Sequence, residues 1–182
     1  MHIKPKKSLG QNFLVDKNIQ KKIIVYLEIK PDDIILEIGA GRGELTNLIA
    51  KEAEKVYALE IDNSLCGILK ENLKSYSNVE IINRDILKFN LRAYFRNLKQ
   101  NLKVFGNIPY YISSPIIEHL FNYRNKIESI FITVQKEFAK RVTAIPGSKE
   151  YGSLSCFVQY YAKPKIIFNI KKASFFPVPK VD

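Results

Sequence analysis

Hydrophobic positions recur along this 182-residue chain with two alternating periods. Short apolar runs rich in β-branched residues predict strands, and the longer segments between them have the three-and-four-residue spacing of amphipathic helices. The predicted strands are an apolar run that begins at residue 34, followed by 56–62, 79–87, 102–109, 129–135 and 165–170. Strands that alternate with crossover helices are typical of parallel sheets. We therefore predict an α/β fold with a Rossmann-like, doubly wound, mostly parallel sheet.

Polar capping residues indicate where several helices begin. Asp16 can cap the first helix, and Asn63 or Ser64 can cap the helix after the second strand. Pro115 suits the first turn of a helix after the fourth strand. Residues 137–142, EFAKRV, begin another helix after the fifth strand. No internal repeat or low-complexity segment breaks this order, so we expect one domain.

Composition favours a folded cytoplasmic protein. The hydrophobic fraction is 46%, which is ordinary for a globular domain. No apolar window approaches the roughly 18 residues that span a bilayer, and the basic start MHIKPKK lacks the apolar core of a secretory signal. Cys66 and Cys156 lie far apart without a CxxC or histidine neighbour. We therefore expect reduced core thiols, no metal site and no membrane association.

Charge indicates the class of partner. Lysines and arginines total 29 against 18 acidic residues, which gives a net charge of +11. Such an excess favours polyanions through phosphate contacts and counterion release. A lysine-rich proteome would produce the same balance without nucleic-acid binding, so the charge by itself leaves the partner open.

The candidate site lies where the predicted strands end, because doubly wound sheets bind ligands at the carboxyl ends of their strands. The first strand leads into a glycine cluster that contains Gly39 and Gly41, which allow a tight turn and a close approach to a ligand. The second strand ends in Glu60 and Asp62, of which Glu60 is better placed to bind ribose hydroxyls. A simple packing turn and a solvated acid are the alternatives.

The third strand leads to Asp85 and Ile86. A carboxylate at this position can accept a hydrogen bond from the exocyclic amine of a nucleobase, while the apolar neighbour lies against the ring. A turn or helix-cap role for Asp85 is the alternative. The glycines, the acid and the Asp-Ile pair together outline an adenosine-shaped site, although a nicotinamide-dependent dehydrogenase would share the first two features.

The fourth strand distinguishes these readings, because residues 104–111 read VFGNIPYY. With Asn107-Ile108-Pro109-Tyr110 in this position, the chain resembles the class I S-adenosylmethionine-dependent methyltransferases. More closely, it resembles the ribosomal RNA adenine dimethyltransferases of the KsgA type. The likeness extends over nearly the whole chain and is carried by the blocks at 10–14, 39–46, 60–62, 84–85, 107–110, 135–137, 146–148, 151–152 and 175–181.

This resemblance implies an rRNA adenine N6,N6-dimethyltransferase. Its substrate would be two adjacent adenines in the 3′-terminal hairpin of 16S rRNA within the immature small ribosomal subunit. The Asn107 side-chain oxygen and the Ile108 carbonyl would each accept one N–H bond from the target amine, and Pro109 would stiffen the turn. Tyr110 and Phe175 would hold the flipped base.

The resemblance also implies the cofactor, S-adenosyl-L-methionine. The cofactor contacts that it implies are Asn12, Leu14, Gly39, Gly41, Glu60, Ile61, Asp85, Ile86 and Asn107. Residues 1–15 would form a flexible flap over the cofactor, and Lys4, Lys6 and Lys7 would meet RNA phosphates. We expect residues 1–182 to form the catalytic domain, without the last sheet strand and the small C-terminal helical domain of the family, and with an exposed sheet edge.

Three other functions stay open at this stage. An erythromycin-resistance methylase has the same core but modifies an adenine of large-subunit 23S rRNA. A ribosome-assembly factor could bind RNA while methylation is secondary. A nicotinamide dehydrogenase would need no motif that holds an amine. We expect a monomer, because no dimer seam is evident in the sequence.

Overall fold

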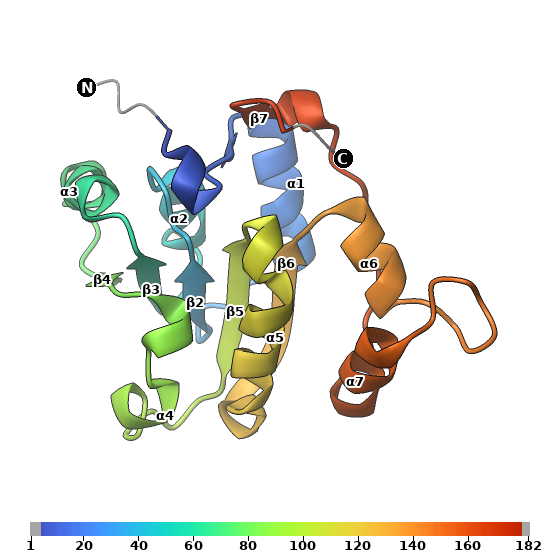
Figure 1. Ribbon diagram of the computed structural model, residues 1–182. Helices are drawn as coiled ribbons and strands as arrows, with labels where there is room; N and C mark the ends of the chain where they lie inside the picture. The colour runs from blue at the N-terminus through green and yellow to red at the C-terminus, as the bar shows by residue number, and fades with distance from the viewer. Residues whose placement is uncertain (1–4, 180–182) are drawn as a thin grey trace.

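The computed structural model describes residues 5–179, and a five-stranded sheet forms its centre (Figure 1). The strands of this sheet are β2 (Ile34–Ile38), β3 (Lys55–Glu60), β4 (Val79–Asn83), β5 (Leu102–Asn107) and β6 (Ile127–Thr133). Their order across the sheet is β4-β3-β2-β5-β6, and every neighbouring pair is parallel. The chain thus starts in the middle of the sheet and winds outward in both directions, which confirms the predicted doubly wound fold.

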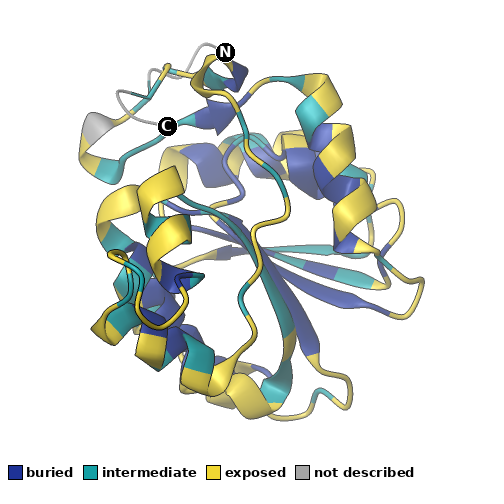
Figure 2. Cartoon of the chain, turned by 90° about the vertical axis from the view of Figure 1, so that its right-hand side faces the viewer, coloured by how far each residue is buried: buried dark blue, intermediate teal, exposed yellow. Residues whose placement is uncertain are grey.

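Helices cover both faces of the sheet. The α-helices are α1 (Lys17–Leu27), α2 (Glu44–Ile49), α3 (Asn63–Asn72), α4 (Leu91–Tyr94), α5 (Ser113–Phe121), α6 (Lys136–Val142) and α7 (Ser153–Tyr161). Short 3-10 helices are η1 (Lys7–Leu9), η2 (Ile86–Lys88), η3 (Tyr110–Ile112), η4 (Arg124–Lys126) and η5 (Lys172–Ser174). Figure 2 shows buried strands between helices whose outward faces are exposed.

Strand alternation divides the core between these two helical layers, because successive side chains point to opposite faces. Ile35 and Phe105 pack in one cluster with α1 and α2. Leu36 and Val104 pack on the other face with α5 and the residues that surround α4. Both faces of the central strands are therefore apolar, as expected for parallel strands covered on both sides.

A buried ion pair fixes the end of the sheet opposite to the strand exits. Lys103 Nζ lies 2.6 Å from Asp33 Oδ2, and both side chains are almost inaccessible to solvent. The same ammonium donates to the backbone carbonyl of Glu28 at 3.1 Å. Asp33 also accepts from the backbone N–H of Lys30 at 2.7 Å. These bonds tie β5 to the turn between α1 and β2.

The predicted sixth strand, 165–170, is wrong. No β-ladder forms in this segment of the described chain. Its apolar side chains gain burial by packing on α1: the Phe168 ring lies 5.3 Å from Tyr26, and Lys22 Nζ lies 4.3 Å from the Phe168 ring centroid. Phe168 and Ile170 are only partly buried, and Ile166 and Ile167 are exposed, so the apolar run indicated neither a strand nor a fully buried segment.

Several predicted boundaries also need correction. Asp62, rather than Asn63 or Ser64, caps α3, because its side chain accepts from the backbone N–H of Ser64. The third and fourth strands end at Asn83 and Asn107, because Asp85 caps η2 and η3 follows the proline.

One cysteine is placed as predicted and the other is not. Both are free thiols, and Cys66 is buried in α3. Cys156 is exposed, because the apolar side of α7 is formed by its neighbours Leu154, Phe157 and Val158. An apolar stretch in sequence therefore overestimated the burial of Cys156.

The buried ion pair yields a test of stability. Lys103→Met leaves the Asp33 carboxylate buried without its cation, so the free energy of unfolding should fall by roughly 3–5 kcal/mol. Lys74→Met removes a cation from the exposed pair of Lys74 with Glu71 and should change it by less than about 0.5 kcal/mol. Urea denaturation measures both variants, and equal losses would contradict the role assigned to Lys103.

Candidate functional site

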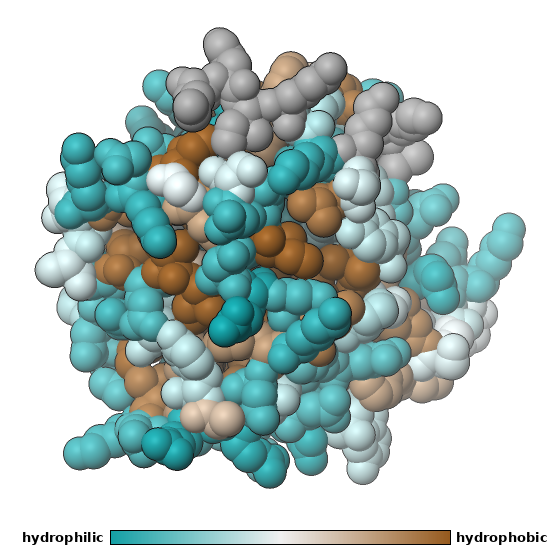
Figure 3. Space-filling view, turned by 60° about the vertical axis from the view of Figure 1, so that its left-hand side comes forward, coloured by the Kyte–Doolittle hydropathy of each residue, from teal (hydrophilic) through white to brown (hydrophobic). Residues whose placement is uncertain are grey.

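The strand exits gather at one edge of the sheet around a cleft of about 1310 Å³. All of the predicted site residues except Leu14 line it. On the face shown in Figure 3, apolar residues gather in a central area among hydrophilic side chains. The edge is therefore hollow and carries apolar surface, which suits a ligand with an aromatic or aliphatic part.

The glycine turn between β2 and α2 forms the first wall of the cleft. Gly39, Gly41 and Gly43 all have positive φ angles, of 74°, 62° and 85°. A Cβ atom on Gly43 would lie 2.9 Å from Leu69 Cδ2, so a larger residue would have to displace the end of the Leu69 side chain. The turn needs glycine chiefly for its positive φ angles, and the Phe13 ring packs against Gly41.

Glu60, the last residue of β3, binds this turn directly. Its buried carboxylate accepts from the backbone N–H of Gly41 and from that of Asp62, each at 2.9 Å. Burial raises the pKa of Glu60, although these two hydrogen bonds act in the opposite direction. The side chain is held rigidly at the cleft wall, with further lone pairs on both oxygens.

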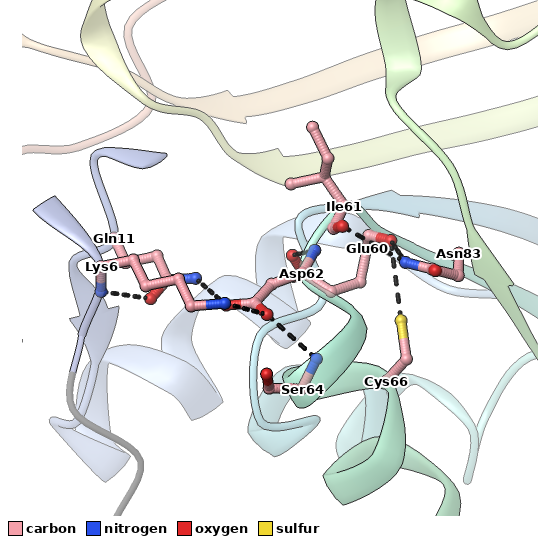
Figure 4. A network of polar contacts seen from close by, with 8 residues as sticks. All are labelled: Lys6, Gln11, Glu60, Ile61, Asp62, Ser64, Cys66 and Asn83. Atoms are coloured by element: carbon pink, nitrogen blue, oxygen red, sulfur yellow. Dashed lines mark hydrogen bonds and ion pairs between the residues drawn. The ribbon is translucent and has the colours of Figure 1, made fainter. Parts of the chain in front are cut away.

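Two residues that were not predicted for the site anchor the backbone of this exit (Figure 4). Asn83 Nδ2 donates to the carbonyls of Glu60 and Ile61 at 2.9 and 3.3 Å. The Cys66 thiol lies 3.6 Å from the Glu60 carbonyl. Ile61 is 50% exposed and lines the cleft. The position of Asn83 as the last residue of β4 is the sequence signal that could have identified it.

At the third exit, Asp85 is a helix cap, which was the alternative to a ligand contact, and it also lines the cleft. The carboxylate accepts from the backbone N–H of Leu87 at 3.0 Å and caps η2. Asp85 still lines the cleft, and Ile86 is buried beside it. The cap orients the carboxylate, and its role as a cofactor contact stays a prediction.

At the fourth exit, the Asn107 side chain is oriented by the N-terminal segment. Its Nδ2 donates to the backbone carbonyl of Asn12 at 2.9 Å. Only the amino end of the amide can donate to a carbonyl, so the Oδ1 atom points the other way and keeps its acceptor capacity. The chain brings residues 12 and 107 together at the cleft, and both line it.

The peptide that follows Asn107 is held from both sides. The Ile108 N–H donates to the Thr133 carbonyl at 3.1 Å, and the Ile108 side chain is buried in the core. Pro109 has φ −59° and begins η3. Tyr110 is 38% exposed, and burial of its hydroxyl raises its pKa. The neutral ring therefore forms part of the cleft wall beside a rigid carbonyl.

A small antiparallel sheet joins the two ends of the chain. β1 (Phe13–Leu14) pairs with β7 (Phe175–Phe176), with Leu14 opposite Phe175. Phe175 lines the cleft, and its role in holding a base stays a prediction. Leu14 packs in the core instead of lining the cleft, and its contact with a cofactor stays a prediction.

Three glutamates lie near the glycine turn, of which Glu37 and Glu60 are buried and Glu44 is exposed. Burial raises the pKa of Glu37 to about 8, and the charges of Glu44 and Glu60 contribute. Desolvation of its carboxyl group also raises the pKa of Glu44. The Oε2 atom of Glu37 has no hydrogen-bond partner in the described part of the chain. Glu37 is therefore protonated at neutral pH and does not line the cleft, whereas Glu60 does.

Of the three lysines expected to meet phosphates, only Lys6 has a described side chain. Lys4 lies outside the described residues, and the side chain of Lys7 is not described. The Lys6 ammonium lies 2.7 Å from Asp62 Oδ1 instead of projecting freely from the surface. Within residues 5–179, no three metal-binding side chains gather, and none of the helices is long and apolar enough to cross a membrane.

Comparison with known proteins gives concordant matches. The family model described as "Ribosomal RNA adenine dimethylase" matches residues 2–182. The ribosomal RNA small subunit methyltransferase A of Alkaliphilus metalliredigens is 46% identical over 178 residues, which are 97% of this chain and 62% of that protein. The protein of the same name from Ligilactobacillus salivarius is 47% identical over 180 residues, which are 97% and 61% of the two chains.

Solved structures agree with the family match. A dimethyladenosine transferase from Plasmodium falciparum has a TM-score of 0.84 and 35% identity, over 93% of this chain and 60% of that one. The 23S rRNA methyltransferase ErmE has a TM-score of 0.79 and 30% identity, over 93% and 66%. The chain spans a little over 60% of the length of the curated relatives it matches.

The pKa of Glu37 generates a prediction on stability. Between the ordinary pKa of a glutamate and about 8, the unfolded chain releases a proton that the folded protein retains, so stability falls as pH rises. Glu37→Gln has no such proton, so its free energy of unfolding lacks this fall with pH. The difference in unfolding free energy, variant minus parent, should therefore increase by on the order of 3 kcal/mol from pH 5 to pH 8.

Urea denaturation of parent and variant at both pH values measures this difference, because contributions of all other groups cancel. Glu52→Gln, a change at an exposed glutamate, serves as the control and should show a small pH-dependent difference. A Glu37→Gln effect of the same size at both pH values would contradict the neutral state assigned to Glu37.

Proposed function

The chain belongs to the ribosomal RNA adenine dimethylase family, and from this premise we propose that it methylates the exocyclic amines of adenines in ribosomal RNA. S-adenosylmethionine is the proposed methyl donor. The observation that carries the proposal is the fourth strand exit, where the Asn107 amide and the Ile108–Pro109 peptide are held rigidly beside Tyr110 in the wall of the cleft.

These groups match the requirements of an adenine amine. Its nitrogen is a poor nucleophile, because its lone pair is conjugated with the ring. Asn107 Oδ1 and the Ile108 carbonyl are suited to accept one N–H bond each, which draws the hydrogens out of the base plane and localises the lone pair. Tyr110 and Phe175 supply rings for the flipped base. Positioning of this kind can lower a barrier by about 7–11 kcal/mol.

The cleft also fits the proposed cofactor. S-adenosylmethionine, when bound, supplies a methyl group on a positively charged sulfur. Glu60 and Asp85 line the cleft, so theirs are the carboxyl groups placed to favour such a cation. Gly39 and Gly41 line the cleft as well, and Glu60 has lone pairs available for ribose hydroxyls. The residues that would hold the cofactor are therefore present on the first three strand exits.

The proposed substrate is small-subunit rRNA, at two adjacent adenines of its 3′-terminal hairpin in the immature subunit. Curated relatives with 44–47% identity are named small subunit methyltransferases, which supports this choice. A large-subunit target is the second candidate, because ErmE shares the fold at 30% identity. Action on ribosomal RNA would place the protein in the cytoplasm, and we propose that it acts as a monomer.

The role of Asn107 can be tested directly. Asn107→Ala removes one acceptor of the amine and should lower the rate of methyl transfer by roughly 100-fold or more, while binding to immature small subunits persists. Transfer of labelled methyl groups to immature small subunits measures the rate. Asn101→Ala, a change at an exposed asparagine, is the matched control and should retain activity. Full activity of Asn107→Ala would refute the proposed mechanism.

The choice of substrate has its own test. Small and large subunits from cells that lack the corresponding activity are offered separately with labelled donor. We expect labelling of small-subunit rRNA at two adenines. Labelling confined to 23S rRNA would assign the protein to the second candidate function.

A further inference from the structure

The N-terminal segment is fastened at two separate strand exits. Residues 6–12, which we call the strap, are held at Lys6 and Gln11 by Asp62, after β3, and at Asn12 by Asn107, at the end of β5. Because β3 and β5 are the two neighbours of β2, a segment fixed to both has to cross the exit of β2. The glycine turn lies at that exit, so the strap spans the part of the cleft proposed for the cofactor.

Both carboxylate oxygens of Asp62 have hydrogen-bond partners in this anchor (Figure 4). Its Oδ1 atom lies 2.7 Å from Lys6 Nζ, and its Oδ2 atom accepts from Gln11 Nε2 at 3.0 Å. Lys6 and Gln11 are also joined to each other, because the Lys6 N–H donates to Gln11 Oε1 at 2.8 Å. The Asp62 side chain is only 1% exposed and also caps α3 through the Ser64 N–H.

A continuous chain of hydrogen bonds leads from this anchor to the glycine turn. The Asp62 N–H donates to Glu60 Oε1, and Glu60 Oε2 accepts from the Gly41 N–H, each at 2.9 Å. The strap, the ribose-binding candidate and the turn thus form one connected network. The hydrogen bonds from Lys6 and Gln11 overcome the effect of burial and lower the pKa of Asp62, so it is ionised at neutral pH.

The anchor is separate from the cleft itself. Of these residues, Gln11 and Glu60 line the cleft, whereas Lys6 and Asp62 are not among the described residues that do so. A change at Lys6 or Asp62 therefore alters how the strap is held without removing a group that contacts a ligand in the cleft.

We propose that Asp62 is a positioning residue that fastens the strap across the glycine turn and thereby slows the release of an adenosyl ligand. Retention of the ligand rests on the proposed function, whereas fastening of the strap does not. Asp62 also couples the strap to Asn107: the strap that it fastens supplies the Asn12 carbonyl that orients the catalytic amide.

Amide hydrogen exchange in the ligand-free protein tests the fastening. Lys6→Met and Asp62→Asn should each speed exchange in residues 8–12 by roughly fivefold to tenfold, and adding Lys6→Met to Asp62→Asn should change it little, because Asp62→Asn already weakens the contacts with both Lys6 and Gln11. Asparagine remains a good helix cap, so α3 should stay intact. Lys6→Arg should retain the protection, and Lys17→Met, at an exposed lysine of α1, is the control.

Release of labelled S-adenosylhomocysteine, chased with unlabelled ligand, tests the retention. The same two variants should release it roughly fivefold to tenfold faster, whereas Lys6→Arg should match the parent. Unchanged exchange in Lys6→Met and Asp62→Asn would overturn the fastening. Faster exchange with unchanged release would overturn the retention. If exchange is faster in the two variants but the parent binds no S-adenosylhomocysteine, the fastening is supported and the result counts against the proposed function.

Discussion

The parallel ladder is the constraint on which the candidate site depends. Ile38, Glu60, Asn83 and Asn107 are each the last residue of a strand, and the register of the sheet aligns these ends at one edge. The ladder leaves residues that are far apart in sequence within reach of one ligand. It also leaves the amino ends of the strands free for structural tasks, such as the buried pair of Lys103 with Asp33.

Charge inside the site has an energetic cost that the fold offsets locally. Glu37 and Glu60 lie beside the glycine turn with raised pKa values, so this edge is less stable than a purely apolar edge would be. Backbone N–H groups compensate Glu60, whereas one oxygen of Glu37 has no described partner. Glu37 avoids the cost of a buried charge by staying protonated at neutral pH, whereas Glu60 relies on its two backbone hydrogen bonds.

The sheet and most of the cleft were predictable from sequence, because each strand exit carries residues with a recognisable chemical role. Gly39, Glu60, Asp85 and Asn107 all line the cleft. The network around Asn83, Asp62 and Lys6 was missed, because it joins side chains through contacts that no sequence period encodes. The short apolar run at 165–170 was also misassigned, since such a run is compatible both with a strand and with a loop whose Phe168 ring packs on α1.

The pairing of β1 with β7 has a consequence for the order in which the protein is made. Phe13 leaves the ribosome early, but its partner Phe176 is added only near the end of the described chain. During synthesis, the central sheet and its four exits can assemble before Phe175 arrives to complete the cleft wall. A nascent chain therefore holds an unfinished cleft until Phe175 has been added, and this wall of the site closes only after the central sheet has been made.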